Sequence, residues 1–95
     1  MRLIGAPLLI EFVERHPDAR KDLDAWRLEV QAATWLTPHD VKARYPKASL
    51  LGKRTVVFNI RQGRYRLHVT IDYPSHSVIV RRIGTHEEYD RWKFD

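Results

Sequence analysis

The sequence contains no cysteine, which excludes a disulfide framework and a thiolate metal site. It also has no apolar run that approaches the length of a membrane span, and Met1-Arg2-Leu3 does not lead into the core of a signal peptide. Three of the five histidines, His16, His39 and His76, lie at expected helix breaks or turns without metal-ligand spacing, and we assign them no role. We therefore expect a soluble cytoplasmic protein that needs no metal and no other cofactor.

Acidic residues are scarce in the second half of the chain. Residues 1–50 hold eight Lys/Arg and seven Asp/Glu, a balance of +1, whereas residues 51–95 hold nine and five, a balance of +4. Between residues 53 and 82, Asp72 is the single acid among seven bases: Lys53, Arg54, Arg61, Arg64, Arg66, Arg81 and Arg82. This distribution favours a sheet surface that meets a polyanion such as nucleic acid. The alternative is that exposed strands and turns simply carry soluble charges.

The length suits one domain, residues 1–95, because 95 residues with 43% hydrophobic side chains and three tryptophans can form one modest core. Apolar residues at 8, 9, 12 and 13 predict an amphipathic helix, with Pro7 near its start. A second stripe, at positions 19, 23, 26, 30 and 33, predicts another helix. We expect Trp26 and Trp35 to be core anchors. Thr37-Pro38-His39-Asp40 predicts a third, short helix that ends before Pro46.

The pattern then changes to the two-residue alternation of strands. Residues 55–61 and 64–73 predict two strands joined by a hairpin at Gln62-Gly63, and residues 46–52 predict a loop before them. In the second strand, Arg66, His68 and Thr70 point away from the apolar face that should meet the helices. The next predicted strand, 78–83, is apolar on both faces, so the pattern leaves open which of Arg81 and Arg82 shares the Arg66 side.

A short helix is predicted directly after this strand. Gly84 gives the backbone room to turn, and Thr85 with Glu88 three residues later forms a capping box. His86 and Tyr89 then share one face of the helix. The expected fold class is α+β, with N-terminal helices on one face of a small antiparallel sheet and a short C-terminal helix. An arginine-bearing strand that ends beside an imidazole and a phenol could bind a phosphate and move its protons.

Several segments together resemble the HigB-type toxins of bacterial toxin–antitoxin systems, which belong to the RelE-like superfamily. The segments are Val57-Phe58-Asn59-Ile60, Tyr65-Arg66-Leu67, Ile79-Val80-Arg81 and Thr85-His86-Glu87-Glu88-Tyr89-Asp90, with Ala25-Trp26 and Trp35-x-x-Pro38 nearer the N-terminus. The resemblance covers nearly the whole chain. One departure is the hairpin, which often reads Gly-Asn in that family and reads Gln62-Gly63-Arg64 here.

The resemblance implies a RelE-like fold that cleaves messenger RNA as an endoribonuclease, usually on the ribosome. It also implies a cognate antitoxin, a HigA-like helix-turn-helix protein, that silences the toxin. Carried over position by position, the expected catalytic residues are Arg66, Arg81, His86 and Tyr89. The expected substrate-binding residues are Lys53, Arg54, Arg64 and His68.

The chemistry of these side chains agrees with that assignment. Cleavage of RNA without a metal requires a deprotonated ribose 2′-hydroxyl, a stabilised phosphorane and a protonated leaving oxygen. Arginine suits the second task because its fork pairs with phosphate oxygens and stays charged. Histidine and tyrosine can transfer the protons, and which of them is the base stays open. Tyr89 has a second interpretation, stacking on a base. The ordinary structural alternatives are a locally bonded His86, a core Tyr89 ring, Arg66 paired with Asp72 or Glu87, and a solvated His68.

Two further function classes stay open. One is a toxin of the same fold that binds a protein target without cutting RNA, as the ParE relatives do. The other is a non-catalytic nucleic-acid-binding module, for which basic strands suffice. The His86 and Tyr89 pair favours the ribonuclease, because a pure binder has no need of an imidazole and a phenol beside arginines.

Overall fold

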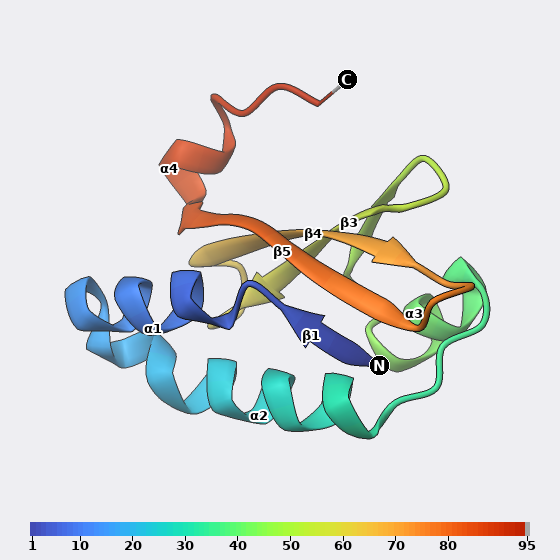
Figure 1. Cartoon of the computed structure of the whole chain (residues 1–95). Coiled ribbons are helices and arrows are strands. Elements are labelled where there is room, and N and C mark those ends of the chain that lie inside the picture. The colour runs from blue at the N-terminus through green and yellow to red at the C-terminus, as the bar shows by residue number, and fades with distance from the viewer. Residues whose placement is uncertain (95) are drawn as a thin grey trace.

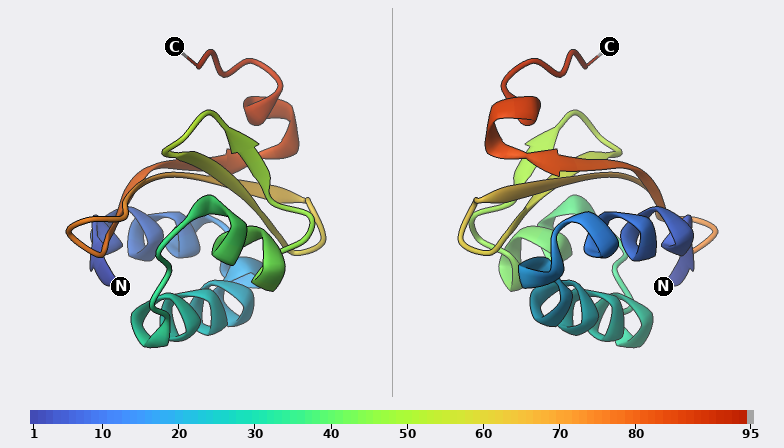
Figure 2. Two further views of the ribbon diagram at one scale, coloured as in Figure 1. Left: turned by 90° about the vertical axis from the view of Figure 1, so that its right-hand side faces the viewer. Right: turned by 90° about the vertical axis from the view of Figure 1, so that its left-hand side faces the viewer.

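The computed structural model describes residues 1–94 and shows an α+β fold, as the sequence predicts. Five strands form one sheet in the order β1-β5-β4-β3-β2. Helices α1, α2 and α3 lie on one side of this sheet, while α4 and the C-terminal segment lie on the other (Figures 1 and 2). The helices are α1 (Ala6–Arg15), a 3-10 turn (Pro17–Ala19), α2 (Arg20–Ala32), α3 (Pro38–Arg44) and α4 (His86–Tyr89). The strands are β1 (Arg2–Ile4), β2 (Ser49–Leu51), β3 (Thr55–Ile60), β4 (Tyr65–Asp72) and β5 (Ser77–Thr85).

The predicted helices are present, and most of each apolar stripe is fully or partly buried, although Leu8 of the first stripe is 40% exposed. Leu9 and Phe12 of α1 are buried, as are Leu23, Trp26 and Val30 of α2. Each fully buried side chain of this size contributes about 1.5–3 kcal/mol relative to leaving it in water. Trp26 and Trp35 both pack against Phe58 of β3, so they anchor the core as expected.

Strand β4 shows the alternation that its sequence predicts. Tyr65, Leu67, Val69 and Ile71 are buried against the helices, and the residues between them are partly exposed on the opposite face, which we call the open face. Strand β3 departs from the pattern at Val57, which is buried even though it alternates with Val56 and Phe58. Val57 pairs with His68, whose ring packs edge-on against Phe94 with ring centres 4.9 Å apart. The open face is therefore partly covered rather than fully solvated.

Two short strands were not predicted. Residues 49–51, expected as part of a loop, form β2 at one edge of the sheet, antiparallel to β3. Residues 2–4 form β1 at the other edge and pair in parallel with β5, where Arg2 lies opposite Ser77. Three residues are too few to show a period, and the partner of β1 lies far away along the chain, so no local signal marks either strand.

A bulge in β5 decides the direction of the two adjacent arginines. The pairing of β4 with β5 shifts register between His68 and Val69, so that His68 lies opposite Arg82 while Val69 lies opposite Val80. A bulge places one extra residue in one strand and re-aims its side chains. Here Arg81 reaches Thr70 and Arg82 reaches His68, so both arginines lie on the open face.

Among residues 1–94, no helix has the length and apolar character needed to cross a membrane.

Candidate functional site

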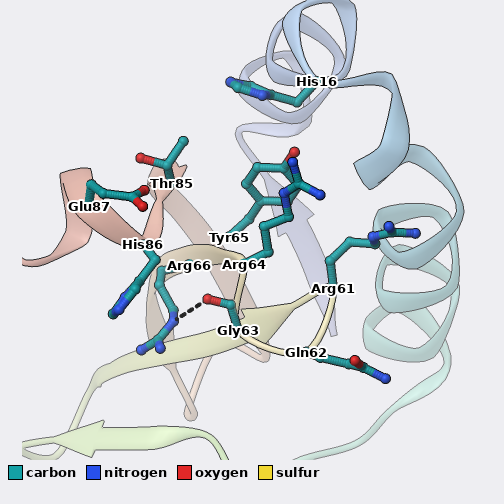
Figure 3. A pocket seen from close by; sticks show the side chains of 10 residues that line it. All are labelled: His16, Arg61, Gln62, Gly63, Arg64, Tyr65, Arg66, Thr85, His86 and Glu87. Atoms are coloured by element: carbon teal, nitrogen blue, oxygen red, sulfur yellow. Dashed lines mark hydrogen bonds between the residues drawn. The ribbon is translucent and has the colours of Figure 1, made fainter.

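An open cleft of about 680 Å³ lies where three separate segments meet. The end of α1 contributes His16, the β3–β4 turn and the start of β4 contribute residues 61–66, and the junction of β5 with α4 contributes residues 85–87. Figure 3 shows these side chains arranged around the opening. Three arginines (Arg61, Arg64 and Arg66) and two histidines (His16 and His86) line the cleft, against one carboxylate, Glu87. The cleft is therefore suited to an anion.

The turn that carries the arginines is strained and tightly held. Arg61, Gln62 and Gly63 all have positive φ, 54°, 57° and 92°, of which only the glycine adopts such an angle without cost. The backbone N–H of Arg61 donates to Asp22 at 2.9 Å, which fastens the turn to α2. Two non-glycine residues of the turn therefore adopt an energetically unfavourable backbone conformation beside the cleft.

Asp18, in the 3-10 turn after α1, fastens the same region from a second side. Its carboxylate accepts a 2.6 Å hydrogen bond from the Tyr65 hydroxyl and lies 3.5 Å from Arg64 and 4.0 Å from Arg61. The Tyr65 hydrogen bond, and after it the two guanidinium charges, lower the pKa of Asp18. The same bond raises the pKa of the Tyr65 phenol. Asp18 thus orients two arginines of the cleft while it stays ionised.

Arg66 is held by two contacts that leave most of its guanidinium group available. Its Nε donates to the Gly63 carbonyl at 3.1 Å, and its Cζ lies 4.8 Å from the centre of the Tyr89 ring. Among residues 1–94 it forms no ion pair. The expected alternative partner Asp72 lies near Arg54 instead, at 3.5 Å. Tyr89 itself does not line the cleft. The Tyr89 ring lies against the Arg66 guanidinium group and packs edge-on against Trp92, with ring centres 5.6 Å apart.

His86 projects into the cleft from the first turn of α4. The predicted capping box is present, since the Glu88 N–H donates to Thr85 Oγ1 at 3.1 Å and the Thr85 N–H donates to Glu88 Oε1 at 2.8 Å. These bonds to Thr85, chiefly the backbone one, lower the pKa of Glu88. The His86 N–H also donates to the Arg64 carbonyl at 3.0 Å, which joins α4 to β4. The His86 side chain is 52% exposed and lies 3.8 Å from Asp90.

The prediction that Gly84 is needed to give the backbone room to turn was wrong. Gly84 does not have a positive φ; it lies inside β5 and is buried. A Cβ at this position would lie 2.9 Å from Cζ2 of Trp92 and 3.2 Å from both Cβ and Oε1 of Glu88. The glycine is therefore required for close packing of α4 and Trp92 on the strand, not for a turn.

A second hollow, of about 370 Å³, lies on the open face. Arg81 and His68 line it, together with Arg82, so the structure separates them from Arg66 and His86. Arg82 donates from Nε to His68 Nδ1 at 3.1 Å, and its Cζ lies 4.5 Å from the Trp92 ring. Burial, followed by the charges of Arg82 and Arg81, lowers the pKa of His68. His68 is therefore a neutral hydrogen-bond acceptor rather than a solvated histidine.

Lys53 and Arg54 lie in the turn between β2 and β3, at the far end of β3 from the cleft. Neither lines the cleft or the second hollow. The structure thus brings together Arg64, Arg66 and His86, backed by Tyr89, and leaves Arg81 with His68 in the second hollow.

Sequence reasoning missed His16, which lines the cleft, and Asp18, which holds two of its arginines. His16 was given no role, and Asp18 was not named among the candidate residues. Both belong to the helical layer, and their contacts with the cleft join segments that are far apart in the sequence. The hydrogen bond between Asp18 and Tyr65, for example, spans 47 positions. No local pattern carries such information.

Residues 19–92, more than half of the chain, match a family model described as HigB_toxin, a RelE-like toxic component of a toxin–antitoxin system. A search among curated proteins gives no match.

Proposed function

The chain belongs to the HigB family of RelE-like toxins, and on that premise we propose that it is an endoribonuclease that cleaves messenger RNA without a metal. The observation that carries the proposal is the setting of Arg66. Its guanidinium group is fixed by Gly63 and Tyr89 and remains unpaired by any carboxylate of residues 1–94, in a cleft that also holds His86. A fixed cation without an internal counter-ion is suited to a phosphate.

The proposed reaction is attack of the ribose 2′-oxygen on the adjacent phosphorus, with release of the 5′-oxygen of the next nucleotide. A base removes the proton of the 2′-hydroxyl, Arg66 stabilises the added negative charge on the phosphorane, and an acid protonates the leaving oxygen. His86 is the cleft group suited to proton transfer, because it is exposed and lines the same cleft as Arg66. Tyr89 keeps Arg66 in place, and Arg64 adds a second cation for the phosphate.

The open face offers a path for the rest of the RNA. Arg81 and His68 in the second hollow lie on the same face of the sheet as Arg66, further along β4 and β5. We propose that they bind the strand away from the scissile phosphate. We further propose that Lys53 and Arg54, in the turn before β3, bind the strand beyond the second hollow. Such contacts, electrostatic for the basic side chains and a hydrogen bond for the neutral His68, contribute affinity rather than chemistry.

A toxin of this family implies a cognate antitoxin partner. We propose that this partner is a HigA-like helix-turn-helix protein that silences the toxin, and that the toxin acts in the cytoplasm on messages bound to the ribosome.

The test is induction of the chain in bacteria, with growth and newly formed RNA 5′ ends as readouts. Arg66→Ala and His86→Ala should abolish or strongly reduce cleavage, by about 10²–10⁴-fold for the proton-transfer group. Matched controls are Arg2→Ala and His39→Ala, which remove an exposed arginine and an exposed histidine outside the cleft. Thermal unfolding must show that each variant folds.

Each other outcome would contradict the proposal. Growth arrest without new RNA ends would favour a toxin that binds a protein target. RNA binding without arrest or cleavage would favour a non-catalytic module. Full cleavage by folded Arg66→Ala or His86→Ala would remove the mechanism assigned to the cleft.

A further inference from the structure

The backbone of His16 is fixed on both sides at the end of α1. Its N–H donates to the Phe12 carbonyl at 2.9 Å, and its own carbonyl accepts from the Ala19 N–H at 3.0 Å. Pro17 follows directly, and a residue before proline is restricted to extended angles, in agreement with φ −133° and ψ 74°. The side chain therefore leaves the helix end in a defined direction.

The ring of His16 is held by two buried aromatic rings. It stacks on Phe12 with ring centres 4.5 Å apart and planes inclined by 28°, and its centre lies 5.1 Å from that of Tyr65. Phe12 and Tyr65 are 2% and 3% exposed, so they form a rigid support. In Figure 3 the ring extends from the helix end above Tyr65, toward the side on which Thr85 and Glu87 lie. The support fixes the plane of the imidazole and leaves its edge at the cleft.

After the capping-box hydrogen bonds, the charge of the His16 ring contributes, as a minor cause, to the lowered pKa of Glu88, but the ring nitrogens are not used in an internal hydrogen bond of residues 1–94. Within residues 1–94 the His16 ring has no hydrogen-bond partner, whereas His68 accepts from Arg82 and His86 lies 3.8 Å from Asp90. The His16 nitrogens are not among the buried polar atoms without a partner, so they are exposed and available to a ligand. His16 instead lines the cleft that contains Arg61 and Arg64.

We propose that His16 is a substrate-contact residue that hydrogen-bonds a phosphate of the bound RNA from the helical layer. The cleft then contacts the substrate from two layers of the fold. Arginines of the β3–β4 turn contact it from the sheet, and His16 contacts it from the helical layer. This inference rests on the proposed function for the identity of the substrate, but it can fail independently of that function. It assigns His16 to binding and leaves the bond-breaking step to the other cleft residues.

Two substitutions separate a contact from a structural role. His16→Phe keeps an aromatic ring on Phe12 and Tyr65 but removes both nitrogens. His16→Gln abandons the stack but keeps a hydrogen-bond donor and acceptor. His39→Phe is the matched control, because His39 is exposed on α3 and lies outside the cleft.

The ligand is a short RNA with 2′-O-methyl groups, which lacks the nucleophile and cannot be cleaved. His16→Phe should bind it about tenfold more weakly than the native chain, as expected for loss of one hydrogen bond to a charged group. His16→Gln should recover part of this loss, and His39→Phe should bind like the native chain. With cleavable RNA, His16→Phe should raise KM with little change in kcat.

The inference is overturned if His16→Phe binds as tightly as the native chain, or if the glutamine variant is the weaker of the two. Failure of the native chain to bind the analogue overturns both this inference and the proposed function. If the native chain binds the analogue in a His16-dependent way but does not cut natural RNA, the His16 contact stands and the ribonuclease proposal fails.

Discussion

Gly84→Ala is a test of how α4 is seated on the sheet. The added Cβ would lie 2.9 Å from Cζ2 of Trp92, a separation that real Cβ contacts do not show, and 3.2 Å from two atoms of Glu88. Trp92 must therefore move, and the Glu88 side chain that closes the capping box on Thr85 must adjust. Because α4 carries His86, the substitution disturbs the cleft from a position outside it.

The expected cost follows from these two contacts. Overpacking a well-filled site costs about 1–3 kcal/mol. Trp92 is only half-buried near the end of the described chain, so it can swing away, and this escape limits the loss to about 1–2 kcal/mol. For a domain of this size each kcal/mol lowers Tm by about 4–8 °C, so Tm should fall by about 4–16 °C.

The assay is a double-mutant cycle by thermal or urea unfolding, using Gly84→Ala, Trp92→Ala and the double variant. Removal of the indole opens the space that the new methyl group needs, so Gly84→Ala should cost less in the Trp92→Ala background. The coupling should be at least about 0.5 kcal/mol. Strictly additive losses, or a Gly84→Ala variant as stable as the native chain, would refute the packing role assigned to this glycine.

Three shorter predictions follow from the contacts of the cleft and the open face. Thr85→Ala removes the N-cap of α4 and should cost about 0.5–2 kcal/mol by urea unfolding, with RNA cleavage reduced because the following histidine loses its position. Asp18→Asn should lower Tm at neutral pH. Because the Tyr65 hydrogen bond lowers the pKa of the Asp18 carboxyl in the folded state, the difference in Tm between variant and native chain should shrink as the pH falls below about 4. A difference that persists at low pH would contradict the Asp18–Tyr65 interaction. The pKa of His68 is also lowered, so the stability that the neutral imidazole contributes is present above about pH 6.5 and is lost on acidification. The free energy of unfolding should therefore change less between pH 7 and pH 5 in His68→Gln than in the native chain. An equal change would show that Arg82 does not bind a neutral imidazole.

The local signals in the chain were strong enough to predict most elements. Apolar stripes predicted α1 and α2, the capping residues Thr37 and Thr85 predicted where α3 and α4 begin, and the alternation in β4 predicted its two faces. Each of these depends on residues within a turn or a strand of one another. The resemblance to the HigB toxins could be recognised for the same reason, since short contiguous segments carry it, and the family match confirms it.

The candidate site could be predicted only in part. Arg66 and His86 were named from the sequence and do share the cleft, but Arg81 was grouped with them and lies in the second hollow. The β5 bulge puts Arg81 on the open face that Arg66 also occupies, but Arg66 lies opposite Gly84, three positions further along β5, so distance along the strands separates the two side chains. His16 lines the cleft, and Asp18 holds its arginines, only because the helical layer packs beside the β3–β4 turn.

The sequence by itself determined the helices, the main strands, the basic character of one half and the family, because each depends on neighbours along the chain or on composition. Tertiary structure alone decided the parallel pairing of β1 with β5, the packing reason for Gly84, and the set of side chains that surround Arg66. These depend on contacts between segments far apart in sequence, and the free energy of such contacts is fixed only when the layers pack together.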